Sequence, residues 1–136
     1  MQITFIYIDL LIKYMSNKAI DTLRWIAILG SASWAGIHMT LLGITLPYIV
    51  KAFFGFVIAI AIVSAMIYVS GKKEFYLPVF VFYILDTALL VESRISIAPV
   101  FGKRLPWTTS AIDSIILDLI MIILSGIIYF VTRKSK

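Results

Sequence analysis

The sequence contains no cysteine and only a single histidine among its 136 residues. The absence of cysteine excludes disulfides, thiolate zinc sites, iron–sulfur clusters and cysteine nucleophiles. One histidine cannot form a multi-histidine metal site or supply both axial ligands of a haem. The sequence therefore predicts neither a metal nor a cofactor held by its own residues.

Charge is also scarce, at 14% of residues, whereas hydrophobic residues reach 62% and the mean hydropathy is +1.05. A soluble domain has roughly 25% charged and 45–50% apolar residues, so the composition indicates an integral membrane protein. The net charge of +5 comes from lysines and arginines that lie between apolar runs, where they set membrane orientation. We therefore expect lipid, and no nucleic acid, as a partner. The sequence contains no phosphate-binding glycine loop, no G-x-S-x-G and no H-E-x-x-H, and it predicts no catalytic residue.

Four apolar runs are long enough to span a membrane as helices, which require about 20 residues. They cover residues 25–46, 52–70, 75–93 and 110–132. The predicted fold is all-α, a four-transmembrane-helix bundle in a single membrane domain over residues 1–136. Residues 1–14 are too short to span, and Gln2, Asp9 and Lys13 share one face, which indicates an amphipathic interfacial helix. Translation from Met15 is the alternative explanation of this segment.

The distribution of basic residues predicts the orientation of the spans. With the amino terminus inside, eight basic residues lie on the inner side and four on the outer side. The inner excess favours a cell-membrane protein with both termini in the cytoplasm.

Two ionisable residues stand out in the first and third spans, where insertion costs at least about 2.5–3.5 kcal/mol each. His38 follows Trp34 by one helical turn, and Asp86 follows Tyr83 by three residues. His38 either relays protons or binds a quinone headgroup, or it is a structural histidine bonded to a neighbouring helix. Asp86 is either a proton or cation site or a partner in an interhelical hydrogen bond.

The fourth span carries Ser114, Asp118 and Ser125 on one face, which must point toward protein because lipid would reject it. In the favoured orientation His38, Asp86 and Asp118 lie at or just outside the midplane of the bilayer. They are expected to form a pocket open to the outer face, a buried network between helices, or a docking surface for another subunit. A second set of charges is expected at the outer boundary, solvated or in ion pairs: Glu92, Arg94, Lys103, Arg104 and Asp113.

Small residues recur at four-residue spacing in the first two spans, at Ala32 and Gly36 and at Gly55 and Ala59. This spacing permits close approach of helices, so we expect the first two spans to form a tight pair.

These features are compatible with three functions. The first is a small non-catalytic accessory subunit of a multi-subunit membrane complex, such as a respiratory complex, because the chain is short and lacks cofactor ligands. The second is a homo-oligomeric proton- or cation-coupled transporter that uses Asp86 and Asp118. The third is a quinone-binding redox membrane protein in which His38, Trp34 and Asp86 hold the headgroup. The abundant isoleucine and missing cysteine are compatible with a heat-adapted microbe.

Overall fold

A computed structural model describes residues 17–43, 45–98 and 101–134, and only the backbone of Lys134. These residues form four long α-helices: α2 (Asn17–Leu42), α3 (Tyr48–Ser70), α4 (Tyr76–Ile95) and α5 (Thr109–Lys134), with a short 3-10 helix, η1 (Lys73–Phe75), before α4. Each long helix, α4 together with η1, is long and apolar enough to cross a membrane. Large apolar side chains are exposed on the outward faces of all four, such as Leu29, Phe56, Leu85 and Ile123. The chain is therefore a multi-pass, all-helical membrane protein, as the sequence predicts.

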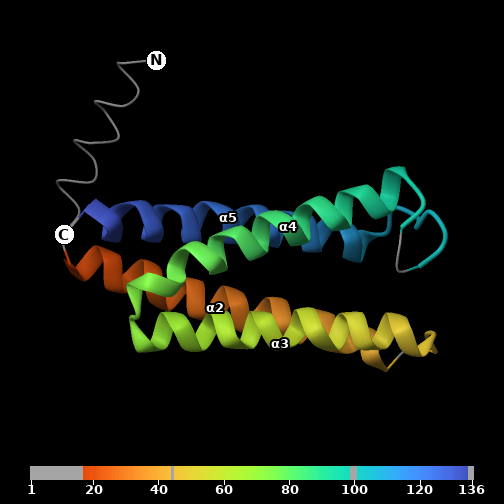
Figure 1. Cartoon of the computed structure of the whole chain (residues 1–136), viewed down its shortest axis with the longest axis horizontal. Helices are drawn as coiled ribbons and strands as arrows, with labels where there is room; N and C mark the ends of the chain where they lie inside the picture. Colours follow the sequence, from red (N-terminus) through yellow and green to blue (C-terminus); the bar gives the residue numbers. More distant parts are fainter. Residues whose placement is uncertain (1–16, 44, 99–100, 135–136) are drawn as a thin grey trace, which may run out of the picture.

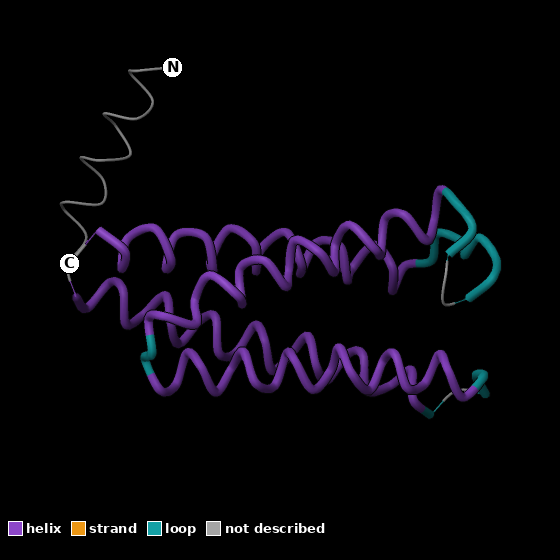
Figure 2. The backbone as a smooth tube through the Cα atoms, in the orientation of Figure 1, coloured by secondary structure: helices purple, strands orange, loops and turns teal. Residues whose placement is uncertain are grey.

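The helices form two hairpins that lie side by side (Figure 1). In one hairpin α2 packs along α3, and in the other α4 packs along α5. The hairpins are joined mainly by packing of α2 against α5, whereas α3 has few contacts with α4. Figure 1 and Figure 2 show that the start of α2, the turn from α3 to α4 and the end of α5 lie at the same end of the bundle, which we call the closed end. The opposite end, the open end, holds the connections that follow α2 and α4.

Aromatic side chains form much of the core between the hairpins. Trp34, Tyr68 and Tyr83 are completely buried, and Tyr76 is 1% exposed. A glycine allows α2 to approach α5 closely, because a Cβ on Gly30 would collide with Sδ of Met121. The two hairpins are thus in tight contact where Gly30 meets Met121.

The helix bounds differ from the predicted spans, most of all in α2. This helix begins at Asn17 rather than at residue 25 and ends at Leu42 rather than at residue 46. Most of the extra residues at its start are polar, so they extend the helix beyond the apolar run. Pro47 is the N-cap of α3, which begins at Tyr48 rather than at residue 52. The other spans differ by at most two residues at each end. The interfacial helix predicted for residues 1–14 lies outside the described residues.

The predicted pairing of the first two spans is confirmed. The small residues that were expected to lie between the two helices do not lie at their contact. Ala32, Gly36 and Ala59 are exposed, and no atom lies within 4 Å of a Cβ built on Gly36 or Gly55. The hairpin instead buries larger side chains, including Val57 and Ile58, with the small residues Ala27, Ala35 and Ala61. The spacing of glycine and alanine therefore indicated the wrong faces of both helices.

An arginine closes the bundle at the closed end. Arg24 of α2 donates from Nη2 and Nε to the carbonyl of Tyr68 at 2.7 and 3.1 Å, and its Nη1 pairs with Asp21 at 2.9 Å. These bonds satisfy a carbonyl in the last turn of α3, which has no partner within its own helix. Gly71 then ends α3 in the left-handed region, at φ 68°.

Gly71→Ala is expected to lower the free energy of unfolding by about 1 kcal/mol. The left-handed backbone disfavours any Cβ, and this Cβ would lie 2.9 Å from Nη2 of Arg24. Gly55→Ala is the matched control and should be neutral, because its Cβ meets open space. Both variants can be compared by SDS-induced unfolding in mixed micelles. Equal unfolding of the two variants would contradict the strain assigned to Gly71.

Candidate functional site: a cavity between the hairpins

The buried polar residues of α2 and α5 meet in one hydrogen bond. Nε1 of Trp34 donates to Oδ1 of Asp118 at 2.5 Å, and both side chains are completely inaccessible. Asp118 reaches this position because the polar face of α5 turns toward α2, as expected for a face that lipid would reject. The bond ties the two hairpins together at the middle of the bundle.

His38 is held by the same tryptophan. Its ring stacks on the indole of Trp34 with centroids 3.7 Å apart and an angle of 16° between the planes. Nδ1 lies 2.9 Å from the backbone carbonyl of Trp34, one turn earlier in α2. The imidazole thus has one face and one nitrogen fixed by its own helix.

Two residues of α4 complete the buried polar cluster. Asp86 is 9% exposed and lies within hydrogen-bonding reach of the Asp118 side chain. Tyr83 donates its hydroxyl to Oγ of Ser31 at 2.7 Å, which links α4 directly to α2. The cluster therefore joins three helices, through the hydrogen bonds of Trp34 with Asp118 and of Tyr83 with Ser31.

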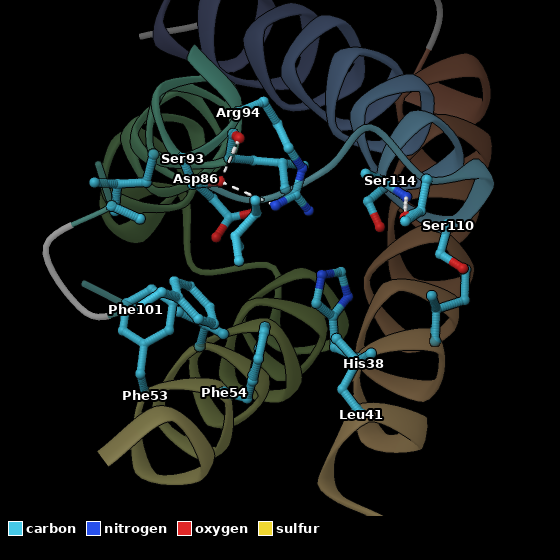
Figure 3. Close-up of a pocket in the computed structure, with 18 of the residues that line it drawn as sticks. His38, Leu41, Phe53, Phe54, Asp86, Ser93, Arg94, Phe101, Ser110 and Ser114 are labelled. Carbon is cyan, nitrogen blue, oxygen red and sulfur yellow. Dashed lines mark hydrogen bonds between the residues drawn. The ribbon is translucent and has the colours of Figure 1, made fainter. Parts of the chain in front are cut away.

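On the open-end side of this cluster the hairpins enclose a cavity of about 470 Å³. Figure 3 shows His38 rising from α2 on one side and Asp86 and Arg94 coming from α4 on the other. Its other lining residues come from all four long helices and from the connections that follow α2 and α4. Most of these are apolar, and the polar ones include Ser93, Ser110 and Ser114.

One wall of the cavity is aromatic. Phe54 lies with its ring centroid 6.3 Å from that of His38 and 6.0 Å from that of Phe101, and Phe53 lies next to it at 5.9 Å. Phe101 belongs to the connection between α4 and α5, which folds back over the end of α4. The backbone N–H of Leu105 donates to the carbonyl of Ser93 at 2.9 Å, and Nε of Arg104 donates to the carbonyl of Arg94 at 2.6 Å. The wall is therefore built partly by described residues of this connection, which hydrogen bond to the end of α4.

Arg94 lies on the cavity near its open end. Its Nη1 is 3.4 Å from Oγ of Ser93, while its Nε is buried without a hydrogen-bond partner among the described residues. A buried N–H without a partner is costly, and a ligand with an acceptor group would remove that cost. Arg94 is thus the main cationic donor that the cavity offers.

The predicted site residues separate into three groups in the structure. His38, Asp86 and Ser114 line the cavity, and Trp34, Tyr83 and Asp118 are buried behind it. Ser125 lies apart from the cavity, further along α5, where its hydroxyl donates to the carbonyl of Met121. The boundary charges Glu92, Lys103, Arg104 and Asp113 are exposed, and none of these four forms an ion pair within the described parts of the chain.

The sequence predicts Arg94 only as a boundary charge, and the structure shows that it also lines the cavity. A signal was present, because Arg94 follows Asp86 by eight residues and so returns toward the same helix face. The aromatic wall was not predicted as part of the site, and neither was the pairing of Tyr83 with Ser31. From the sequence alone, a phenylalanine in an apolar span that lines a cavity cannot be distinguished from one that faces lipid.

Within residues 17–43, 45–98 and 101–134, no group of three histidine, aspartate or glutamate side chains is placed to hold a metal ion. Comparison of the chain with protein-family models, curated proteins and solved structures finds no match.

Proposed function

We propose that this protein binds a quinone-type molecule, with an oxygen-substituted ring and an apolar tail, in the cavity between its hairpins. The observation that carries the proposal is the cavity itself, with a volume of about 470 Å³, a mainly apolar lining and a few polar groups. Sites for small molecules typically have about 300–1,000 Å³ and this mixture of lining. With both termini in the cytoplasm, the cavity opens in the outer half of the membrane.

The lining residues suit a planar headgroup. The rings of Phe54 and Phe101 offer flat apolar surface, and aromatic rings pack well against such faces. His38 and Asp86 face the cavity from different hairpins, so one headgroup can contact both. The apolar side chains of Leu89 and Leu90 provide the surface for a tail.

The other two functions expected from the sequence draw less support from this geometry. The accessory-subunit hypothesis used the polar helix faces as contacts with neighbouring subunits. These faces meet one another inside this chain, through Trp34 with Asp118 and Tyr83 with Ser31, so they do not require a neighbour. A transporter also needs access from the closed end, where Arg24 and the paired rings of Tyr68 and Tyr76 occupy the space between the helices.

Binding can be measured with Trp34 as the only tryptophan, after Trp25→Phe and Trp107→Phe. Trp25 and Trp107 are 63% and 50% exposed, whereas Trp34 is inaccessible and stacks on a residue that lines the cavity. A benzoquinone with a decyl tail, titrated into the protein in lipid nanodiscs, should quench Trp34 saturably at one molecule per chain. A matched protein that keeps only Trp25 should show unsaturated, collisional quenching. Unsaturated quenching of Trp34 as well would refute the proposal.

A further inference from the structure

The base of the cavity presents hydrogen-bond acceptors, and from this we infer that the bound headgroup is a hydrogen-bond donor. The site then selects the hydroquinone, which carries hydroxyl groups, over the quinone, which carries only carbonyl oxygens. This inference rests on the proposed function of the cavity and specifies its ligand.

The first acceptor is Nε2 of His38. A backbone carbonyl can only accept, so the 2.9 Å contact between Nδ1 and the carbonyl of Trp34 places the hydrogen on Nδ1. In a neutral imidazole the other nitrogen then carries a lone pair and accepts. Stacking on Trp34 keeps the ring from turning, and Figure 3 shows the ring directed into the cavity. His38 therefore offers the ligand an acceptor in a fixed position.

The second acceptor is Asp86. Behind it, Asp118 uses Oδ1 to accept the hydrogen bond of Trp34, and its inaccessible Oδ2 meets no protein donor among the described residues. Asp86 lies within hydrogen-bonding reach of this carboxyl group. Two carboxyl groups can form a hydrogen bond only when they share a proton, and two adjacent buried carboxylates do not both stay ionised. Asp86 lines the cavity, so with the shared proton held between the two residues it presents an acceptor oxygen there.

The cationic hydrogen-bond donor of the cavity, Arg94, lies away from the acceptors at the base. Arg94 lies two turns from Asp86 toward the open end, so its guanidinium can bind an oxygen on the outer side of the ring. A hydroquinone suits this arrangement better, since one hydroxyl donates to one of the two acceptors at the base and the other hydroxyl accepts from Arg94. A quinone would place a carbonyl oxygen against two acceptors at the base. A contact between two acceptors, with no hydrogen to bond them, weakens binding by about tenfold.

The inference is tested by calorimetric titration of the protein in nanodiscs with a decyl hydroquinone and the matching decyl quinone, without oxygen. The hydroquinone should bind about tenfold more tightly. Its dimethyl ether, which keeps the ring and tail but has no donor, should bind no better than the quinone. In His38→Phe, which keeps a ring of similar size but no acceptor, the preference should shrink. Because the preference is measured first in the unaltered protein, the test does not depend on the variant folding.

The possible results separate the inference from the proposed function. Equal binding of the two forms, or tighter binding of the quinone, overturns the inference and leaves quinone-type binding in place. Tight binding of the dimethyl ether overturns it as well, because the ether donates no hydrogen bond. Failure of every ligand to bind overturns both proposals.

Discussion

Ser114→Phe is expected to abolish saturable quenching of Trp34, with a loss of affinity of at least about a hundredfold. Ser114 is 6% exposed and lines the cavity beside the region between His38 and Asp86. A phenyl ring at this position would occupy the space of the headgroup. An interior cavity accepts added volume more readily than a packed core, so the variant should still fold.

The matched control for this experiment is Ile116→Phe on the same helix. Ile116 is 53% exposed on the outer face of α5, so a larger apolar side chain there extends into lipid and leaves the cavity unchanged. Both variants are titrated in the background that keeps Trp34 alone, and circular dichroism checks their helix content. Unchanged affinity in a folded Ser114→Phe protein would place the ligand outside this cavity.

The four spans could be predicted because each depends on a local property, the length of an apolar run. Both ends of the first span and the start of the second were missed by four residues or more, because hydropathy reports contact with lipid whereas hydrogen bonds and caps decide where a helix begins and stops. The first helix begins at Asn17, well before the apolar run, and its polar start is used by the ion pair of Asp21 with Arg24. The bonds from Arg24 to α3 depend on how two helices lie beside each other, and no local pattern encodes that.

In the candidate site, too, local features could be predicted from the sequence and contacts between helices could not. His38, Asp86 and Asp118 were identifiable because polar groups in hydrocarbon are costly and need partners. Their partners were not, since Trp34 and Asp118 are 84 positions apart in the sequence and meet only where α2 crosses α5. Of the three arrangements that the sequence left open, the structure contains features of two, a buried network and a cavity beside it. The cavity itself is a property of shape, produced by hairpins that contact each other closely toward one end.

Asp118→Leu is expected to cause the largest loss of stability, about 2 kcal/mol in the free energy of unfolding. It leaves Nε1–H of Trp34 without its acceptor in a place that water does not reach, and it removes the neighbour of Asp86. Hydrogen bonds between membrane helices contribute on average only about 0.6 kcal/mol and at most about 1.7 kcal/mol. This bond should lie near the upper value, because it is short, completely buried and made to a carboxyl group.

A double-mutant cycle with Trp34→Phe isolates the hydrogen bond from other effects of the substitutions. The coupling energy between Trp34→Phe and Asp118→Leu should be about 1–2 kcal/mol, measured by SDS-induced unfolding. Asp118→Asn is the matched variant: its amide oxygen can still accept from Trp34, and its NH₂ group can donate to Asp86. It should therefore retain most of the stability that Asp118→Leu loses. If the cycle gives no coupling, or if the asparagine variant is as unstable as the leucine variant, then the Trp34–Asp118 bond does not hold the hairpins together. In that case the Trp34–Asp118 hydrogen bond would not be what positions His38 and Asp86 at the base of the cavity.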